Sequence, residues 1–328
     1  MSYPEKTISA VVITYKEFSY IYETLDSIFA QDYPAIEIVV TDDGSPEFPE
    51  EKLRGYIESH KGENIVGYVL AHSPENVGTV KNINEGIRRS SGDFIKIIAG
   101  DDAYYDGHVF SAQMACFDRD PDLMIVTGRI CECNEKMQPI YKEQVESTNK
   151  ALPTIFSMEP KAYFKRCKKE HLFPLVTQAL LIRKSFFEQY GCYDERYCLL
   201  EDPPMEKRII ISRVPVAAAD CTVVKHRASV GVSANEQFFA KKQSKYFLDL
   251  VNYVKNELMT RPEYFPPFRT KQRYKREWFR YRMSVAESQK EKLLLAIQNV
   301  GTAFWFVILN PSRAWDKVRR VFKRTTKR

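Results

Sequence analysis

The chain has 328 residues, enough for one large domain with an appendage or for two domains. Its hydrophobic content of 44% and charged content of 28% are ordinary for a soluble globular protein. The net charge of +6 is uneven, because residues 261–328 carry 18 Lys or Arg against 5 Asp or Glu, which leaves residues 1–260 at −7. A basic end on an acidic body indicates an anionic partner surface. No nucleic-acid motif is present, so we expect no nucleic-acid partner.

The first hundred residues alternate apolar runs with amphipathic segments. Strands are predicted at 8–14, 36–41, 65–70 and 94–99, and helices at 18–29, near 49–59 and near 80–89. Gly92 is expected at the C-cap of the third helix. The alternation predicts a mostly parallel sheet with helices on both faces, and such sheets bind ligands beyond the carboxyl ends of their strands.

Three of these strands end in side chains that suit a nucleotide. The first ends at Tyr15, the second at Asp42 and Asp43, and the fourth at Asp101 and Asp102. An aromatic ring beside a carboxylate suits a nucleobase, and a further carboxylate pair suits a divalent cation that bridges phosphates. No glycine-rich phosphate loop is present, so a metal would have to neutralise a diphosphate. The alternative for Asp101 and Asp102 is a solvated turn that caps the next helix.

A second acidic motif follows near residue 200. A strand is predicted at 179–183 and a short helix at 184–190 that ends at Gly191. Glu201 and Asp202 then precede two prolines, and Pro203 fits the first turn of a helix. Asp202 is therefore expected at the N-cap, while its second carboxylate oxygen could still face a cleft.

Five motifs occur in order across roughly residues 7 to 233: ISAVVITYKE, QDYPAIEIVVTDDGS, ENVGTVKNINEGIRRSSGDFIKIIAGDD, GCYDE and LLED. The ordered set resembles glycosyltransferase family 2 of the bacterial polysaccharide type, an inverting family with the GT-A fold. The resemblance implies a Rossmann-like three-layer α/β/α domain with a mostly parallel mixed sheet. It also implies transfer of a sugar from a nucleotide-diphosphate sugar, such as a UDP-hexose, to a hydroxyl of a glycan or lipid-linked glycan, with Mn²⁺ or Mg²⁺ as cofactor.

The resemblance also implies roles for single residues. Asp202 matches the catalytic base and Glu201 lies on the acceptor side, whereas Asp102 matches the metal ligand. Donor nucleotide binding is expected at the first two strand ends and beside the metal ligand, at Thr14, Tyr15, Glu17, Asp42, Asp43 and Asp101. His226 and Arg227 lie where related enzymes often place a diphosphate ligand; the alternative is a strand end with solvated charges.

The sequence departs from the family pattern in two places. Ala99 or Gly100 stands where members often carry an additional Asp, so the cation would have fewer protein ligands. Pro203 and Pro204 follow the Glu-Asp motif, where Trp is frequent. Two rival functions remain. One is a catalytically inactive, membrane-associated scaffold of the same fold, and the other is a sugar-nucleotide pyrophosphorylase, which would need a Gly-rich basic loop after the first strand.

The last part of the chain is predicted to be a separate helical, basic region, so the domains are expected at 1–235 and 236–328. Residues 290–309 contain a nearly continuous apolar run of about 17 residues, which is marginal in length for a bilayer span, and basic residues flank the run. An interfacial helix on an anionic membrane surface is the favoured interpretation, and packing on the catalytic domain is the alternative.

The N-terminus and the cysteines bear on localisation. The N-terminal residues lack the pattern of a signal peptide. The 7 cysteines show no repeated spacing, and Cys131 and Cys133 lack a second pair at zinc spacing. We therefore expect reduced cysteines in a cytoplasmic enzyme, peripheral on the inner face of the cytoplasmic membrane.

Overall fold

The computed structural model describes residues 6–170, 174–228, 245–258, 260, 275–276, 278–279, 282–283, 286, 288–301, 304 and 308. The chain divides into two compact units, residues 1–167 with 172–240 and residues 168–171 with 241–328. The assignment of a catalytic and a helical domain on either side of residue 235 stays a prediction.

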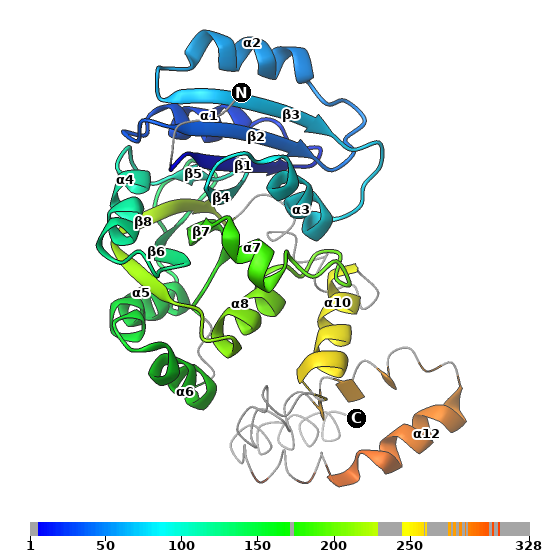
Figure 1. The fold of residues 1–328 in the computed structure, drawn as a ribbon. Coiled ribbons are helices and arrows are strands. Elements are labelled where there is room, and N and C mark those ends of the chain that lie inside the picture. The colour runs from blue at the N-terminus through cyan, green and yellow to red at the C-terminus, as the bar shows by residue number, and fades with distance from the viewer. Residues whose placement is uncertain are drawn as a thin grey trace. The chain divides into compact units, whose positions relative to one another are not determined.

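The described part of the first unit contains one eight-stranded sheet (Figure 1). Its strands are β1 (Ile8–Thr14), β2 (Ile36–Asp42), β3 (Ile65–His72), β4 (Phe94–Ala99), β5 (Ala103–Tyr104), β6 (Ile125–Cys133), β7 (Leu181–Arg183) and β8 (Val216–Arg227). They lie in the order β3-β2-β1-β4-β7-β6-β8-β5. The first four strands in this order are parallel, and β7 runs antiparallel to both β4 and β6.

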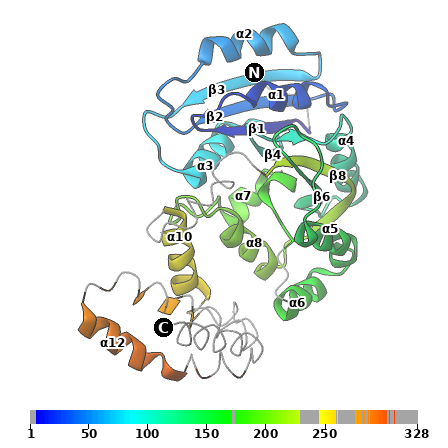
Figure 2. The same cartoon turned by 180° about the vertical axis from the view of Figure 1, so that it is seen from behind.

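Helices cover both faces of the parallel strands. On one face, α1 (Ile21–Phe29), α2 (Glu50–His60) and α4 (Val109–Arg119) share a hydrophobic core with the strands, and Figure 2 shows α1 in front of β1 and β2. On the other face, α3 (Thr79–Arg89) packs on β1 and β2, with Gly86 against Val11. Because both faces are covered, β1 and β2 are buried almost throughout, which is why they read as continuous apolar runs.

The second half of the first unit contains further helices and a 3₁₀ turn. They are α5 (Glu143–Phe156), α6 (Pro160–Glu170), the 3₁₀ turn η1 (Thr177–Ala179), α7 (Ser185–Tyr190) and α8 (Asp202–Ile211). The last three residues of α6 fall in the second unit. The second unit contains α10 (Lys245–Tyr253), the π-helical turn η2 (Val254–Leu258) and α12 (Gln289–Gln298). Among the described residues, no helix is both long enough and apolar enough to cross a membrane.

The strands and helices predicted for the first hundred residues are present, with ends shifted by up to three residues. The predictions for Gly92 and for the strand at 179–183 were wrong. Gly92 is not a C-cap, because α3 ends at Arg89 and Ser90 follows it in extended conformation. A Cβ on Gly92 would lie 2.6 Å from the carbonyl oxygen of Thr7, so glycine is needed there for close chain approach. The strand predicted at 179–183 is only β7, because η1 occupies the residues before it.

Candidate active site

A cavity of about 400 Å³ lies at the carboxyl ends of β1 and β4, where the open sheet predicts a ligand site. Segments from both halves of the first unit line it, including the turn after β4, η1, the start of α8 and the end of β8. Most of the predicted site residues are in this lining: Thr14, Tyr15, Glu17, Asp43, Asp101, Asp102, Glu201, Asp202 and His226. The two others, Asp42 and Arg227, are buried behind it.

Asp42 supports the loop that follows β1. Its carboxylate accepts hydrogen bonds from the backbone N and the hydroxyl of Ser45, at 2.7 and 2.6 Å, and from Nδ1 of His72 at 2.7 Å. The Ser45 hydroxyl in turn accepts a 2.7 Å bond from the backbone N of Lys16, a residue held at a positive φ of 63°. Asp42 therefore fixes the backbone beside Tyr15 and does not itself reach the cavity.

Asp43 lines the cavity and also holds the turn that precedes α3. Its carboxylate accepts bonds from Val77 N at 2.8 Å, Gly78 N at 3.0 Å and Asn76 Nδ2 at 2.7 Å. Asn82, one turn into α3, also lines the cavity, and its Oδ1 is buried without a hydrogen-bond partner among the described residues. This wall therefore combines a fixed carboxylate with an acceptor that a bound molecule could use.

The turn after β4 carries the acidic pair. Asp102 is 1% exposed, and its Oδ1 accepts a 2.8 Å bond from the backbone N of Arg227. Its Oδ2 is buried without a partner in the described structure. Burial raises the pKa of Asp102 to about 7, although His226 opposes the shift. A buried carboxylate oxygen without a donor fits a divalent cation, which prefers oxygen ligands.

The described residues contain no group of three or more His, Cys, Asp or Glu side chains that could hold a metal ion by themselves. A cation at Asp102 would therefore take its remaining ligands from phosphate and water. This is a usual arrangement for Mg²⁺, which is commonly bound by one or two carboxylates together with substrate phosphates. The residues present fit the implied cofactor in this form.

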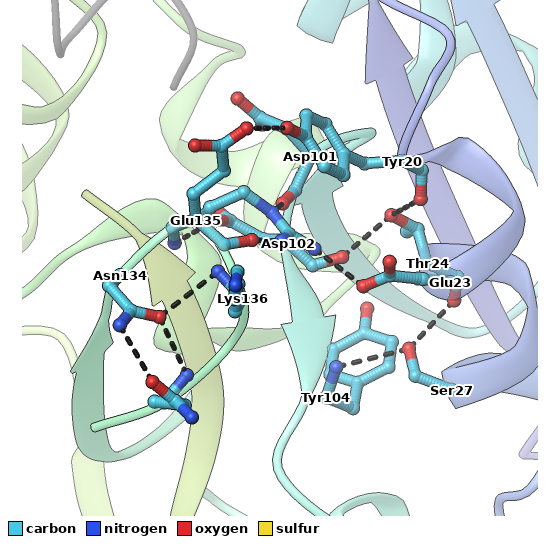
Figure 3. A network of polar contacts seen from close by, with 12 residues as sticks. Tyr20, Glu23, Thr24, Ser27, Asp101, Asp102, Tyr104, Asn134, Glu135 and Lys136 are labelled. Atoms are coloured by element: carbon cyan, nitrogen blue, oxygen red, sulfur yellow. Dashed lines mark hydrogen bonds and ion pairs between the residues drawn. The ribbon is translucent and has the colours of Figure 1, made fainter. Parts of the chain in front are cut away.

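Arg227 holds the acidic turn from behind. Its guanidinium donates to the carbonyl of Asp101 at 2.8 Å, to a carboxylate oxygen of Glu23 at 2.6 Å and to the carbonyl of Glu135. It also lies 4.0 Å from the ring centroid of Tyr20. Figure 3 shows Tyr20 at the start of α1, Glu23 in α1 and Glu135 in the turn after β6 gathered around the acidic turn. The structure thus gives Arg227 a supporting position and does not bring its guanidinium to the cavity.

His226 lines the cavity and is oriented by a carboxylate. Its Nδ1 lies 3.1 Å from Glu132 Oε2, which also accepts a 2.9 Å bond from Lys142. Burial lowers the pKa of His226, but Glu132 and Asp102 outweigh it, so the pKa lies above its ordinary value. A histidine that is protonated more readily than usual places positive charge near the acidic turn.

Asp202 is the first residue of α8, and the prediction that it is the N-cap was wrong. Glu201 is the N-cap residue, and its side chain forms no capping hydrogen bond. Prolines occupy the first turn of the helix. Asp202 Oδ1 accepts both the backbone N of Thr177 at 2.9 Å and the Thr177 hydroxyl at 2.5 Å. Both bonds use one oxygen, so Oδ2 is left for a bound molecule. Burial raises the pKa of Asp202, and the two hydrogen bonds from Thr177 lower it by less, so the pKa lies above its ordinary value.

The sequence patterns do not single out Thr177, Asn82 or Glu132. Glu132 lies in the Cys131–Cys133 stretch, whose only sequence signal is a pair of cysteines, and Asn82 lies inside one of the five family motifs. Thr177 has no sequence signal, because its role depends on a 3₁₀ turn and on Asp202, which lies 25 residues later in the chain.

Solved structures of one class of protein have a similar fold. Staphylococcus aureus TarS residues 1–349 in complex with UDP-GlcNAc superimposes with a TM-score of 0.56 at 14% identity, over 90% of this chain and 78% of that one. A mannosyltransferase from Pyrobaculum calidifontis, in complex with GDP-Man and Mn²⁺, superimposes with a TM-score of 0.55 at 17% identity. The superposition covers 95% of this chain and 83% of that one. The fold is that of the GT-A glycosyltransferases, which confirms the predicted fold class.

The sequence comparisons then identify the family. The family model "Glycosyl transferase family 2" matches residues 9–191, more than half of the chain, so the chain belongs to glycosyltransferase family 2. An uncharacterized glycosyltransferase of Rickettsia typhi is 26% identical over 195 residues, 57% of this chain and 54% of the relative.

Another relative, from Methanococcus voltae, is a dolichyl N-acetyl-α-D-glucosaminyl phosphate 3-β-D-2,3-diacetamido-2,3-dideoxy-β-D-glucuronosyltransferase. It is 31% identical over 147 residues, 43% of this chain and 44% of the relative. The chain thus spans about half the length of these two curated relatives.

Proposed function

We propose that the protein is an inverting glycosyltransferase of the hexosyltransferase type. It would move a sugar from a nucleotide-diphosphate sugar of the UDP-hexose class to a hydroxyl of a glycan or lipid-linked glycan in polysaccharide synthesis. One observation carries the proposal: Asp202 and Asp102 line the same cavity, and each has one carboxylate oxygen that the described protein does not use.

The two carboxylates suit different halves of the reaction. Asp202 Oδ2 would take the proton of the acceptor hydroxyl as the new bond forms, and its raised pKa makes it a better base than an ordinary aspartate. Thr177 keeps Oδ1 occupied and so orients Oδ2. A single displacement with inversion needs one such base, whereas a covalent route would need a nucleophile on the opposite face of the sugar.

On the donor side, Tyr15 and Asp43 would contact the nucleobase, with Thr14, Glu17 and Asp101 nearby. Asp102 would hold Mn²⁺ or Mg²⁺, with His226 close to the diphosphate. A bound cation would offset the negative charge that develops on the leaving diphosphate. Arg227 would act through the turn it supports, and Glu201 would lie on the acceptor side.

Donor binding and turnover test the proposal. We expect one family of sugar nucleotides, in a panel of UDP-, GDP- and dTDP-sugars, to raise the thermal midpoint with Mn²⁺ and less so with EDTA. The same donors should release nucleoside diphosphate slowly in the absence of acceptor, because water can replace the hydroxyl. Donor binding without any metal-dependent release or transfer would support an inactive scaffold and contradict the enzyme.

We further propose that the C-terminal region binds an anionic membrane surface. The part of α12 and its continuation that the structure describes exposes an apolar series at helical spacing: Leu293, Leu294, Ile297, Val300, Phe304 and Ile308, each 50% to 64% exposed. The basic residues from 313 onward lie outside the described residues. Each Lys or Arg near such a surface contributes roughly 1 kcal/mol, so several would hold an interfacial helix reversibly.

Co-sedimentation with vesicles containing phosphatidylglycerol tests this second proposal. The full chain should bind, and high salt should weaken binding without abolishing it, because buried apolar area persists when charge is screened. A truncation after Gln289, and the full-length double variant Leu293→Ser with Ile297→Ser, should bind less. If all three proteins sedimented equally, the region would instead pack on protein.

A further inference from the structure

Lys96 is a buried charged group that the proposed chemistry does not use. It interrupts the apolar strand FIKIIA of β4, and its side chain is 0% exposed. No carboxylate among the described residues forms an ion pair with it. Burying a lysine without a counter-charge is costly, and burial lowers the pKa of Lys96 to about 7.

The ammonium of Lys96 donates its hydrogen bonds to one segment of backbone. Its Nζ donates to the carbonyls of Gln178 at 3.3 Å and Leu180 at 3.2 Å. The carbonyl between them, that of Ala179, accepts a 3.0 Å bond from Nε2 of Gln113, another fully buried side chain. Two buried polar side chains therefore hold three consecutive carbonyls just before β7, in η1 and the residue after it.

The same segment begins with Thr177, which donates hydrogen bonds to the proposed base, Asp202. Thr177 donates twice to Oδ1 of Asp202, and its hydroxyl also lies 3.1 Å from the hydroxyl of buried Tyr193. A 3₁₀ turn of three residues lacks the hydrogen-bond ladder of a strand or long helix. Its position against α8 therefore depends on side chains that hold its carbonyls.

We propose that Lys96 is a positioning residue for Asp202: it fixes the 177–180 segment so that Thr177 orients the carboxylate toward the acceptor. This inference rests on the proposed function of Asp202. The other groups around the ammonium do not help to fix the 177–180 segment. The ring of Tyr104 lies 5.5 Å away, and the Cys221 thiol is near enough to affect the lysine electrostatically. Burial raises the pKa of both groups, so they stay neutral near pH 7.

Three single variants of the full chain separate this role from a general loss of stability. Lys96→Met keeps most of the length of the unbranched side chain and removes every donor, whereas Lys96→Gln keeps donors without the charge. Lys184→Met is the matched control, because Lys184 also donates to a backbone carbonyl, that of Ser90 at 2.7 Å, away from the base. The donor is whichever of UDP-N-acetylglucosamine, UDP-glucose and GDP-mannose the wild-type protein hydrolyses fastest with Mn²⁺.

Two measurements are made on each variant. Hydrogen exchange by mass spectrometry should be faster in peptides covering residues 174–183 of Lys96→Met, and unchanged there in Lys184→Met. Steady-state kinetics should show kcat reduced by about 10- to 100-fold in Lys96→Met with an almost unchanged KM for the donor, since misplacement of a catalytic group affects the reacting geometry more than donor binding. Lys96→Gln should recover part of the lost kcat.

The outcomes separate the inference from the proposed function. Unchanged exchange in Lys96→Met overturns the inference whether or not the protein is active, and faster exchange with kcat near the wild-type value overturns it as well. An equal fall of kcat in the Lys184 variant would assign the effect to stability and also overturn it. If Lys96→Met does not fold, Lys96→Gln decides by the same criteria. Absence of hydrolysis or transfer by the wild-type protein instead contradicts the proposed function.

Discussion

Replacing Asp202 by Asn should reduce sugar transfer by about 10²- to 10⁴-fold, the usual contribution of a general base, while donor binding stays nearly unchanged. Both hydrogen bonds from Thr177 go to one carboxylate oxygen, and an amide oxygen in the same place can accept them. The substitution therefore keeps the contacts that position the side chain and removes only the basic oxygen. Isothermal titration with the donor, alongside a transfer assay, measures the two effects separately.

A matched control for this substitution is Asp194→Asn. Asp194 also accepts a backbone N–H, that of Arg196 at 3.1 Å, but it belongs to the turn before α8 and does not line the cavity. We expect transfer by this variant to stay near the wild-type rate. Near-wild-type turnover by Asp202→Asn would show that another group takes the acceptor proton.

The parts of the fold that the sequence predicts are those encoded locally. β1, β2 and β4 are short apolar runs rich in β-branched residues, and the helices between them have apolar residues at helical spacing. Because these strands are parallel, the rule that ligands bind at their carboxyl ends also locates the cavity. The strand ends alone therefore place Asp43 and Asp102 at one edge of the sheet.

The remainder depends on contacts between residues far apart in the chain. Arg227 reaches Glu23, 204 residues earlier, and its backbone N reaches Asp102, 125 residues earlier. A basic residue at a strand end resembles a phosphate ligand in sequence, and only the packing shows that this guanidinium is enclosed. Lys96 is similar, because a lysine in an apolar strand indicates burial or an edge equally well until its partners are known.

The second large effect is expected at the donor end of the cavity. Asp102→Asn should abolish the gain in UDP affinity that Mn²⁺ provides and leave metal-free UDP binding nearly unchanged. The amide oxygen can still accept from the backbone N of Arg227, so the turn keeps its shape, but the buried oxygen without a partner becomes an NH₂ group that cannot bind a cation. Titration of UDP with and without Mn²⁺ gives both affinities.

Asp43→Ala provides the contrast, because Asp43 is assigned to the nucleobase wall and not to the cation. Its carboxylate also holds Val77 and Gly78, so we expect weaker UDP binding with or without Mn²⁺ and a lower thermal midpoint. Chelation of the metal should therefore change UDP affinity differently in the Asp43 and Asp102 variants. EDTA should lower UDP affinity in the Asp43 variant, as in the wild-type protein, and should have no further effect in the Asp102 variant. An identical response of both variants to EDTA would contradict the assignment of the cation to Asp102.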